Sequence, residues 1–155
     1  MSGSGGAAVD VVVAALIRCP IGVVAAFASD PANAPDWYAK ISEVEWQTRP
    51  PVDVGTRVAF VARFLGKELR YTYEIVEHTP KLLVMRTAQG PFPMETSYHY
   101  ASMPDGDTRM TLRNRGIPSG FSRLVAPFVS RAMRRAMRGD LRALKVILER
   151  DQPYA

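Results

Sequence analysis

The segment FVSRAMRRAMRGDLRALKVILE, residues 128–149, decides the fold. Arranged as an α-helix, it places its charged residues on one side and its apolar residues on the other. Arginines and one lysine fill one side, and apolar residues recur at intervals of three and four on the other: Phe121, Leu124, Val125, Phe128, Ala132, Met133, Ala136, Met137, Leu141, Leu144 and Leu148. This pattern predicts an amphipathic helix of about eight turns, with Ser119 as its N-cap. We expect Pro127 to kink the helix or to divide it, and Gly139 to allow close packing on another layer.

Upstream of this helix the period changes to two, as in β-strands that are buried on one face. Apolar or aromatic residues occupy every second position in two neighbouring segments, as Val58, Phe60, Ala62, Phe64 and then Leu69, Tyr71, Tyr73, Ile75. Turn sequences such as Leu65-Gly66-Lys67 and Pro104-Asp105-Gly106-Asp107 separate six segments of this kind between residues 41 and 113. Consecutive hairpins predict antiparallel pairing.

The N-terminal part completes the expected architecture. Val9–Arg18 is rich in valine and predicts a buried strand, Pro20 opens a short helix, and Ala32–Tyr38 adds a second helical turn. We therefore expect one α+β domain at 9–150, a flexible tail at 1–8 and a C-terminal tail at 151–155. The apolar sides of the sheet and of the long helix must bury one another.

Composition excludes several classes of protein. With 155 residues, 47% hydrophobic and 23% charged, the chain predicts one globular domain, and no apolar run reaches the roughly 20 residues of a transmembrane helix. Cys19 is the single cysteine, which predicts a reducing, cytoplasmic setting. The net charge of +5 is concentrated in residues 119–150. No aromatic residue is interleaved with these arginines, so we expect no nucleic-acid binding and regard an anionic membrane surface as a weaker option.

Five segments carry a family resemblance: the segment from Asp30-Pro31 to Trp37, PPVDVGTRVAF at 50–60, YTYEIVEHTPKLLVMRTAQGPF at 71–92, DGDTRMTLR at 105–113 and DLRALKVILE at 140–149. Through them the chain resembles the START-like, helix-grip superfamily (SRPBCC), and within it the bacterial polyketide-cyclase/dehydrase and lipid-transport branch. The resemblance covers Val9 to Arg150.

This resemblance implies a curved sheet of seven antiparallel strands that grips the C-terminal helix around an internal cavity. Relatives use the cavity for lipids, sterols, polyketides or plant hormones, and some act as cyclases, dehydratases or co-chaperone activators. Fold alone does not choose among these roles.

Strand alternation and the helical stripe predict the side chains that face the cavity. They combine apolar area with a few hydroxyl groups, as a small-molecule site requires. The predicted ligand-binding residues are Trp37, Val58, Phe60, Phe64, Tyr71, Tyr73, Met85, Met94, Thr96, Tyr98, Phe121, Leu124, Val125 and Phe128.

Catalytic candidates are fewer. A cyclase or dehydratase needs an acid or a base inside the cavity. The candidates are three tyrosines, which act as hydrogen-bond donors at neutral pH: Tyr71, Tyr73 and Tyr98. His78, near a strand end before a turn, is expected at the surface, and the alternation predicts outward positions for His99 and Glu95. Arg86 and Asn114 would enter the cavity only if the strand faces shift by one.

We expect no metal and no cofactor, because two histidines and one cysteine make a poor ligand set and no phosphate-binding glycine loop is present. The leading hypothesis is a binding or carrier protein, without catalysis, for a small hydrophobic lipid, polyketide, aromatic or isoprenoid molecule. The first alternative is a polyketide cyclase or dehydratase. The second is a regulatory module that acts through the basic face of the long helix.

Overall fold

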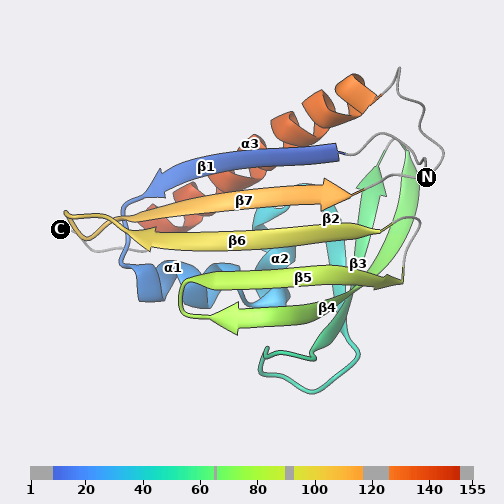
Figure 1. The fold of residues 1–155 in the computed structure, drawn as a ribbon, viewed down its shortest axis with the longest axis horizontal. Helices are drawn as coiled ribbons and strands as arrows, with labels where there is room; N and C mark the ends of the chain where they lie inside the picture. The colour runs from blue at the N-terminus through green and yellow to red at the C-terminus, as the bar shows by residue number, and fades with distance from the viewer. Residues whose placement is uncertain (1–8, 65, 90–92, 117–125, 151–155) are drawn as a thin grey trace, which may run out of the picture.

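Seven strands form one open antiparallel sheet (Figure 1). The structure, a computed structural model, describes residues 9–64, 66–89, 93–116 and 126–150. Its elements are β1 (Val9–Ile17), α1 (Ile21–Ala28), the 3₁₀ turn η1 (Pro31–Asn33), α2 (Ala34–Trp37), β2 (Ile41–Trp46), β3 (Arg57–Phe64), β4 (Lys67–Thr79), β5 (Leu82–Gln89), β6 (Met94–Ser102), β7 (Thr108–Gly116) and α3 (Ala126–Arg150). The predicted order of strand, two short helices, six strands and long helix is confirmed.

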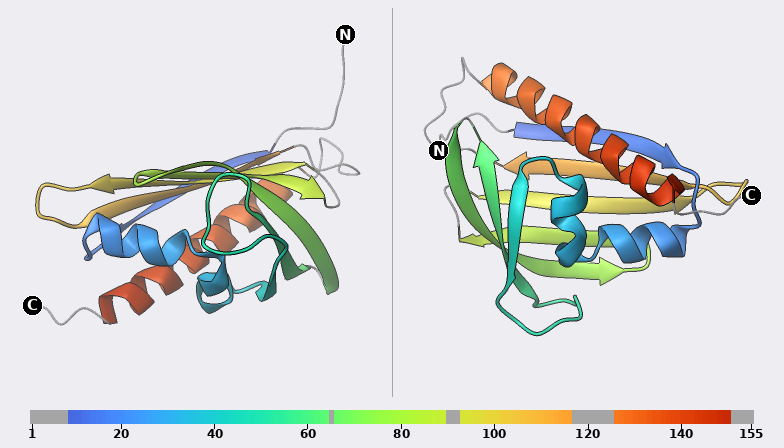
Figure 2. Two further views of the ribbon diagram at one scale, coloured as in Figure 1. Left: turned by 90° about the horizontal axis from the view of Figure 1, so that it is seen from below. Right: turned by 180° about the vertical axis from the view of Figure 1, so that it is seen from behind.

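Strand order in the sheet is β1-β7-β6-β5-β4-β3-β2, so β2 to β7 form a meander and β1 joins it beside the last strand. The β1–β7 ladder runs in register from Val9 opposite Gly116 to Ile17 opposite Thr108. The β4–β5 ladder shifts register twice, between Thr72 and Tyr73 and again before Glu77. Such bulges bend a strand, and Figure 2 shows the sheet curling at the β2–β4 end.

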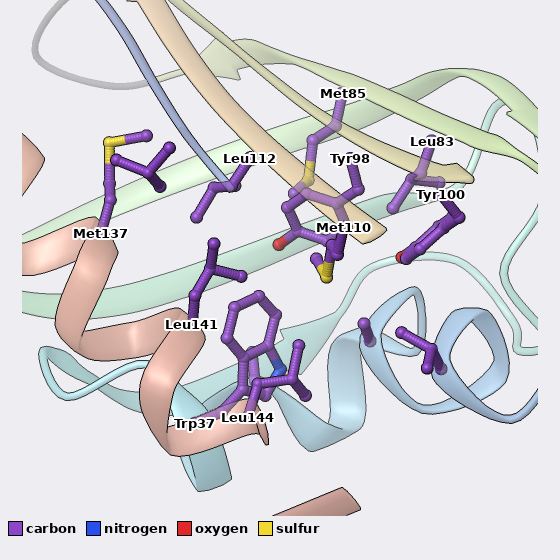
Figure 3. Packing of buried hydrophobic residues seen from close by; sticks show 14 of the residues in the cluster. Trp37, Leu83, Met85, Tyr98, Tyr100, Met110, Leu112, Met137, Leu141 and Leu144 are labelled. Carbon is purple, nitrogen blue, oxygen red and sulfur yellow. The ribbon is translucent and has the colours of Figure 1, made fainter. Parts of the chain in front are cut away.

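All helices lie on the concave side of the sheet (Figure 2). α3 crosses that side diagonally, and its apolar stripe is buried there, with Leu141 at 2% and Leu144 at 0% exposure. Figure 3 shows both leucines and Trp37 facing the sheet residues Leu112 and Tyr98. The core is therefore the layer between the sheet and α3, as the two apolar patterns required.

The described part of α3 starts at Ala126 and runs to Arg150. The segment before Ala126, which Pro127 was expected to divide from the main helix or to join through a kink, lies outside the described residues. The expected N-cap, Ser119, lies outside the described residues. Among the helices of the described ranges, none is both long and apolar enough to cross a membrane.

Gly139 is on the exposed side of α3, and the expectation that it packs closely on the sheet is wrong. A Cβ built there would meet no atom within 4 Å. Because glycine is a poor helix former, we expect Gly139→Ala to raise the free energy of unfolding by about 0.5–1 kcal/mol, measured by urea titration. No stabilisation would mean that the helix needs the glycine for another reason.

The C-terminal half of α3 also holds the outer edge of β1. Lys145 Nζ donates to the carbonyl oxygen of Leu16 at 2.9 Å, and the backbone N–H of Arg18 donates to Glu149 Oε2 at 2.9 Å. Lys145 and Glu149 form an ion pair with each other. The end of the edge strand is thus covered by side chains of α3.

Candidate ligand-binding cavity

A cavity of about 210 Å³ lies between the concave face of the sheet and α3. Side chains of β2 to β7 form one wall, and α3 with the segment between α2 and β2 forms the other. Its lining is mostly apolar and aromatic, and consists of Tyr38, Lys40, Ile41, Phe60, Ala62, Tyr71, Tyr73, Met85, Met94, Thr96, Tyr98, Asn114, Met133, Ala136, Met137 and Asp140.

Two tyrosines from different layers meet at one side of the cavity. Tyr38, which ends α2, and Tyr98, on β6, place their hydroxyl oxygens 2.6 Å apart. The Trp37 ring packs against both, with centroid distances of 4.1 Å to Tyr38 and 5.7 Å to Tyr98. This aromatic group fixes the position of the segment after α2 above the sheet.

A second aromatic group lines the strand wall. The ring of Tyr73 lies edge-on to Phe60 at 5.8 Å and tilted to Tyr71 at 6.3 Å. The Tyr73 hydroxyl hydrogen bonds with Thr96, and Thr96 Oγ1 in turn donates to Asn114 Oδ1 at 2.5 Å. A short polar chain therefore crosses an otherwise apolar wall.

The tyrosine hydroxyls remain protonated across the neutral range. Burial raises the pKa of Tyr73 to about 12 and raises the pKa values of Tyr38 and Tyr98 further above the ordinary value of 10. Burial also raises the pKa of Tyr71. These groups can donate hydrogen bonds to a carbonyl or accept them from a hydroxyl, but they cannot serve as bases at pH 7.

Asp140 is the acidic side chain in the cavity lining. It comes from the apolar side of α3, is 7% exposed, and its Oδ1 accepts a hydrogen bond from the backbone N–H of Ala39 at 3.0 Å. Burial raises its pKa from 3.8 to about 6, while the bond from Ala39 and the charge of Lys40 lower it in part. A carboxyl group in this range can both release and take up a proton near neutral pH.

The structure brings many of the predicted binding residues together. Those that line the cavity are Phe60, Tyr71, Tyr73, Met85, Met94, Thr96 and Tyr98. Val58 and Trp37 are buried in the core, and neither lines the cavity. The side chain of Phe64 and the residues Phe121, Leu124 and Val125 lie outside the described part of the chain.

Phe128 is on the wrong side of α3 for a binding residue. It is 68% exposed and does not line the cavity. Phe128 precedes Met133 by five residues, which at about 100° per residue separates the two side chains by about 140° around the helix. The spacing of four to Ala132 was misleading, because Ala132 is exposed as well.

The alternation missed several lining residues. Asn114 follows Met110 and Leu112 on the same face of β7, so it enters the cavity without any shift in the strand face. Asp140 stands three residues after Met137, inside the apolar stripe. A carboxylate in such a stripe was the signal that could have identified it.

His78 and His99 are outside the lining, and no three His, Cys, Asp or Glu side chains in the described ranges lie close enough to hold a metal ion.

An open antiparallel sheet that grips a long C-terminal helix over an internal cavity defines the START-like, helix-grip class. The chain belongs to the polyketide cyclase/dehydrase and lipid transport family, whose model matches residues 8–149. No curated protein matches the sequence significantly.

Solved structures with this fold come from several bacteria. A START superfamily protein of Mycobacterium smegmatis superposes with a TM-score of 0.79 at 12% identity, covering 92% of this chain and 99% of that one. The Zhui aromatase/cyclase of a Streptomyces species gives 0.77 at 14% identity, covering 93% and 95%. A Thermus thermophilus protein gives 0.77 at 20% identity, covering 90% and 96%. At these identities the likeness concerns the fold.

Proposed function

We propose that the protein binds a small, largely apolar molecule in the cavity between the sheet and α3, as a carrier of a lipid, polyketide or other aromatic or isoprenoid metabolite. The observation that carries the proposal is the lining itself: an apolar and aromatic surface with a few neutral hydroxyl groups at defined positions. Apolar area supplies affinity, and the hydroxyl groups orient the ligand.

The size and polarity of the cavity narrow the ligand further. At about 210 Å³ it is smaller than the roughly 300–1,000 Å³ of pockets for drug-sized ligands, which favours a compact molecule of one or two rings. The Thr96–Asn114 pair and the Tyr38–Tyr98 pair favour a ligand with hydroxyl or carbonyl groups at two points of its edge. A dihydroxybenzene or dihydroxynaphthalene fits this description, and phenol or 1-naphthol can occupy one of the two points.

Blocking the cavity tests the proposal. Ala136 lines the cavity on α3, and we expect Ala136→Phe to weaken the binding of 1-naphthol, measured by isothermal titration calorimetry, at least about tenfold, because the added ring occupies the ligand volume.

Ala132→Phe is the matched control for the blocking variant. Ala132 is exposed one turn earlier on the same helix, so the same substitution there should leave the affinity unchanged. Equal affinities of the wild type and Ala136→Phe, or no binding of any phenol, naphthol or fatty-acid probe, would contradict the proposal.

A second function, acid–base catalysis on a polyketide-like substrate, is favoured by Asp140. Its carboxyl group, with a pKa raised to about 6, shares the cavity with neutral hydroxyl groups that can donate to a substrate carbonyl. A base that removes a proton next to a polarised carbonyl is what an aldol cyclisation followed by dehydration requires. In this reading Tyr71, Tyr73 and Tyr98 bind the carbonyl oxygens.

The two functions differ in an experiment on Asp140. If the protein is a cyclase, Asp140→Asn should abolish turnover of a poly-β-ketone while the compound still binds, and wild-type turnover should rise with pH through about 6 as the base forms. If the protein is a carrier, the wild type leaves the compound unchanged at every pH. Turnover that Asp140→Asn does not alter would exclude Asp140 as the base.

A further inference from the structure

Four arginines form a single line on the outer side of α3. Arg131, Arg135, Arg138 and Arg142 follow one another at spacings of four, three and four. At about 100° per residue they fall within about 60° of one another around the helix, over about 16 Å of its length. All four are exposed, on the side opposite the stripe that faces the sheet. We call this line the arginine ridge.

The charge of the arginine ridge is uncompensated by the described residues. None of its four guanidinium groups makes an ion pair or a side-chain hydrogen bond there. Five arginines of the sheet, by contrast, have acidic partners on other strands: Arg57–Glu74, Arg70–Glu45, Arg86–Glu95, Arg113–Asp10 and Arg115–Glu95.

The acids of α3 do not reach the ridge either. Asp140 is buried at the cavity, and Glu149 is held by Lys145 and by the backbone N–H of Arg18. α3 has a net charge of +5, equal to that of the whole chain, so the rest of the protein is neutral on balance. The positive potential is therefore concentrated on one face.

Apolar side chains stand at both ends of the arginine ridge. Phe128 precedes Arg131 by three residues and is 68% exposed, and Val146 follows Arg142 by four and is 50% exposed. The exposed residues beside the arginines on this side, Ala132 and Gly139, are small, and at Gly139 there is open space around the backbone. A basic line with exposed apolar residues on the same side is typical of helices that lie on a membrane surface.

We propose that the protein docks on the surface of an anionic lipid bilayer through the arginine ridge, with Phe128 inserted among the headgroups. Lipid phosphates match the unpaired guanidinium groups, and the adjoining acyl layer accepts the phenyl ring. Nucleic acid would match the charge but offers a duplex surface with no apolar layer for Phe128. The inner side of the same helix lines the cavity, so the bilayer would lie about one helix diameter, or about 10 Å, from a bound ligand.

Vesicle sedimentation tests the docking surface with the full chain. The wild type should bind vesicles of phosphatidylcholine with about a quarter phosphatidylglycerol, release at about 1 M salt, and ignore vesicles of phosphatidylcholine alone. Arg135→Glu/Arg138→Glu should lower the partition coefficient at least about tenfold, because two attractive charges near the anionic surface become two repulsive ones.

The matched control reverses two arginines on the opposite side of the sheet. Arg63 and Arg109 are exposed on β3 and β7 and point away from α3, so Arg63→Glu/Arg109→Glu gives the same net charge and should keep most of the binding. A loss as large as that of the ridge variant would show that only net charge matters, and would overturn a defined surface. Circular dichroism spectra should be unchanged in both variants.

Replacing Phe128 distinguishes insertion of its ring into the bilayer from electrostatic attraction of the arginines alone. Phe128→Ser removes apolar area without changing charge, so we expect about tenfold weaker binding to the anionic vesicles with the same dependence on salt. Full binding by this variant would contradict insertion of the ring. Binding of duplex DNA or RNA by the wild type, with no binding to anionic vesicles, would overturn the proposal in favour of a nucleic-acid surface.

Discussion

Replacing Asp140 with asparagine is expected to raise the free energy of unfolding at pH 7 by about 3 kcal/mol and to change it much less near pH 4. Burial raises the pKa of Asp140 from 3.8 to about 6, so the folded state holds this proton more tightly than the unfolded state. The stabilisation is complete below about pH 3.8 and is lost as the pH rises towards about 6. The asparagine oxygen can still accept the bond from Ala39.

Urea titrations of wild type and Asp140→Asn between about pH 4 and pH 7 measure this effect as a difference that grows with pH. Asp10→Asn is the control of opposite sign. The hydrogen bond from Arg113 lowers the pKa of Asp10, so its stabilisation is present at neutral pH and is lost as the pH falls. Parallel curves for the wild type and Asp140→Asn would contradict a raised pKa.

Truncating Leu144 is expected to lower the free energy of unfolding by about 3 kcal/mol. Leu144 is fully buried on the inner side of α3, and Figure 3 shows it beside Trp37. Leu144→Ala removes buried methyl groups and leaves a void that the curved sheet cannot close. The denaturation midpoint, followed by tryptophan fluorescence, reports the loss.

Val146 provides the control two residues further along the same helix. It is 50% exposed, so Val146→Ala should change the stability by less than about 0.5 kcal/mol. Equal midpoints for the two alanine variants would mean that α3 does not form the core with the sheet. A large loss for Val146→Ala would indicate that its outer side is also covered.

The fold was predictable because the two-residue repeat of apolar side chains in the strands and the helical repeat in α3 are nearly uninterrupted. Phe60, Tyr71 and Tyr73 reached the cavity as expected, since alternation in a strand determines the face directly. On α3 the prediction of which side chains face the cavity was weaker. Successive side chains of a helix are rotated by about 100°, so an apolar residue at the start of a helix can belong to either side. Phe128 was assigned to the wrong side for this reason.

The environment of Asp140 could not be predicted from its position in the sequence. Its carboxyl group accepts a hydrogen bond from the backbone N–H of Ala39, about a hundred residues earlier, and burial raises its pKa. Neither the pairing nor the depth of burial follows from the pattern around Asp140. The sequence shows only a carboxylate among apolar neighbours, which predicts a buried acid but not its partner.

The pairing of β1 with β7 has a consequence for synthesis on the ribosome. The strand made first finds its partner only after the residues of β7 have left the exit tunnel, about a hundred positions later. Until then Val9, Val11 and Val13 have no sheet to join, whereas β2 to β7 can form hairpin by hairpin. We therefore expect slow, late closure of the N-terminal strand, and a nascent chain that depends on chaperones to shield this valine-rich segment.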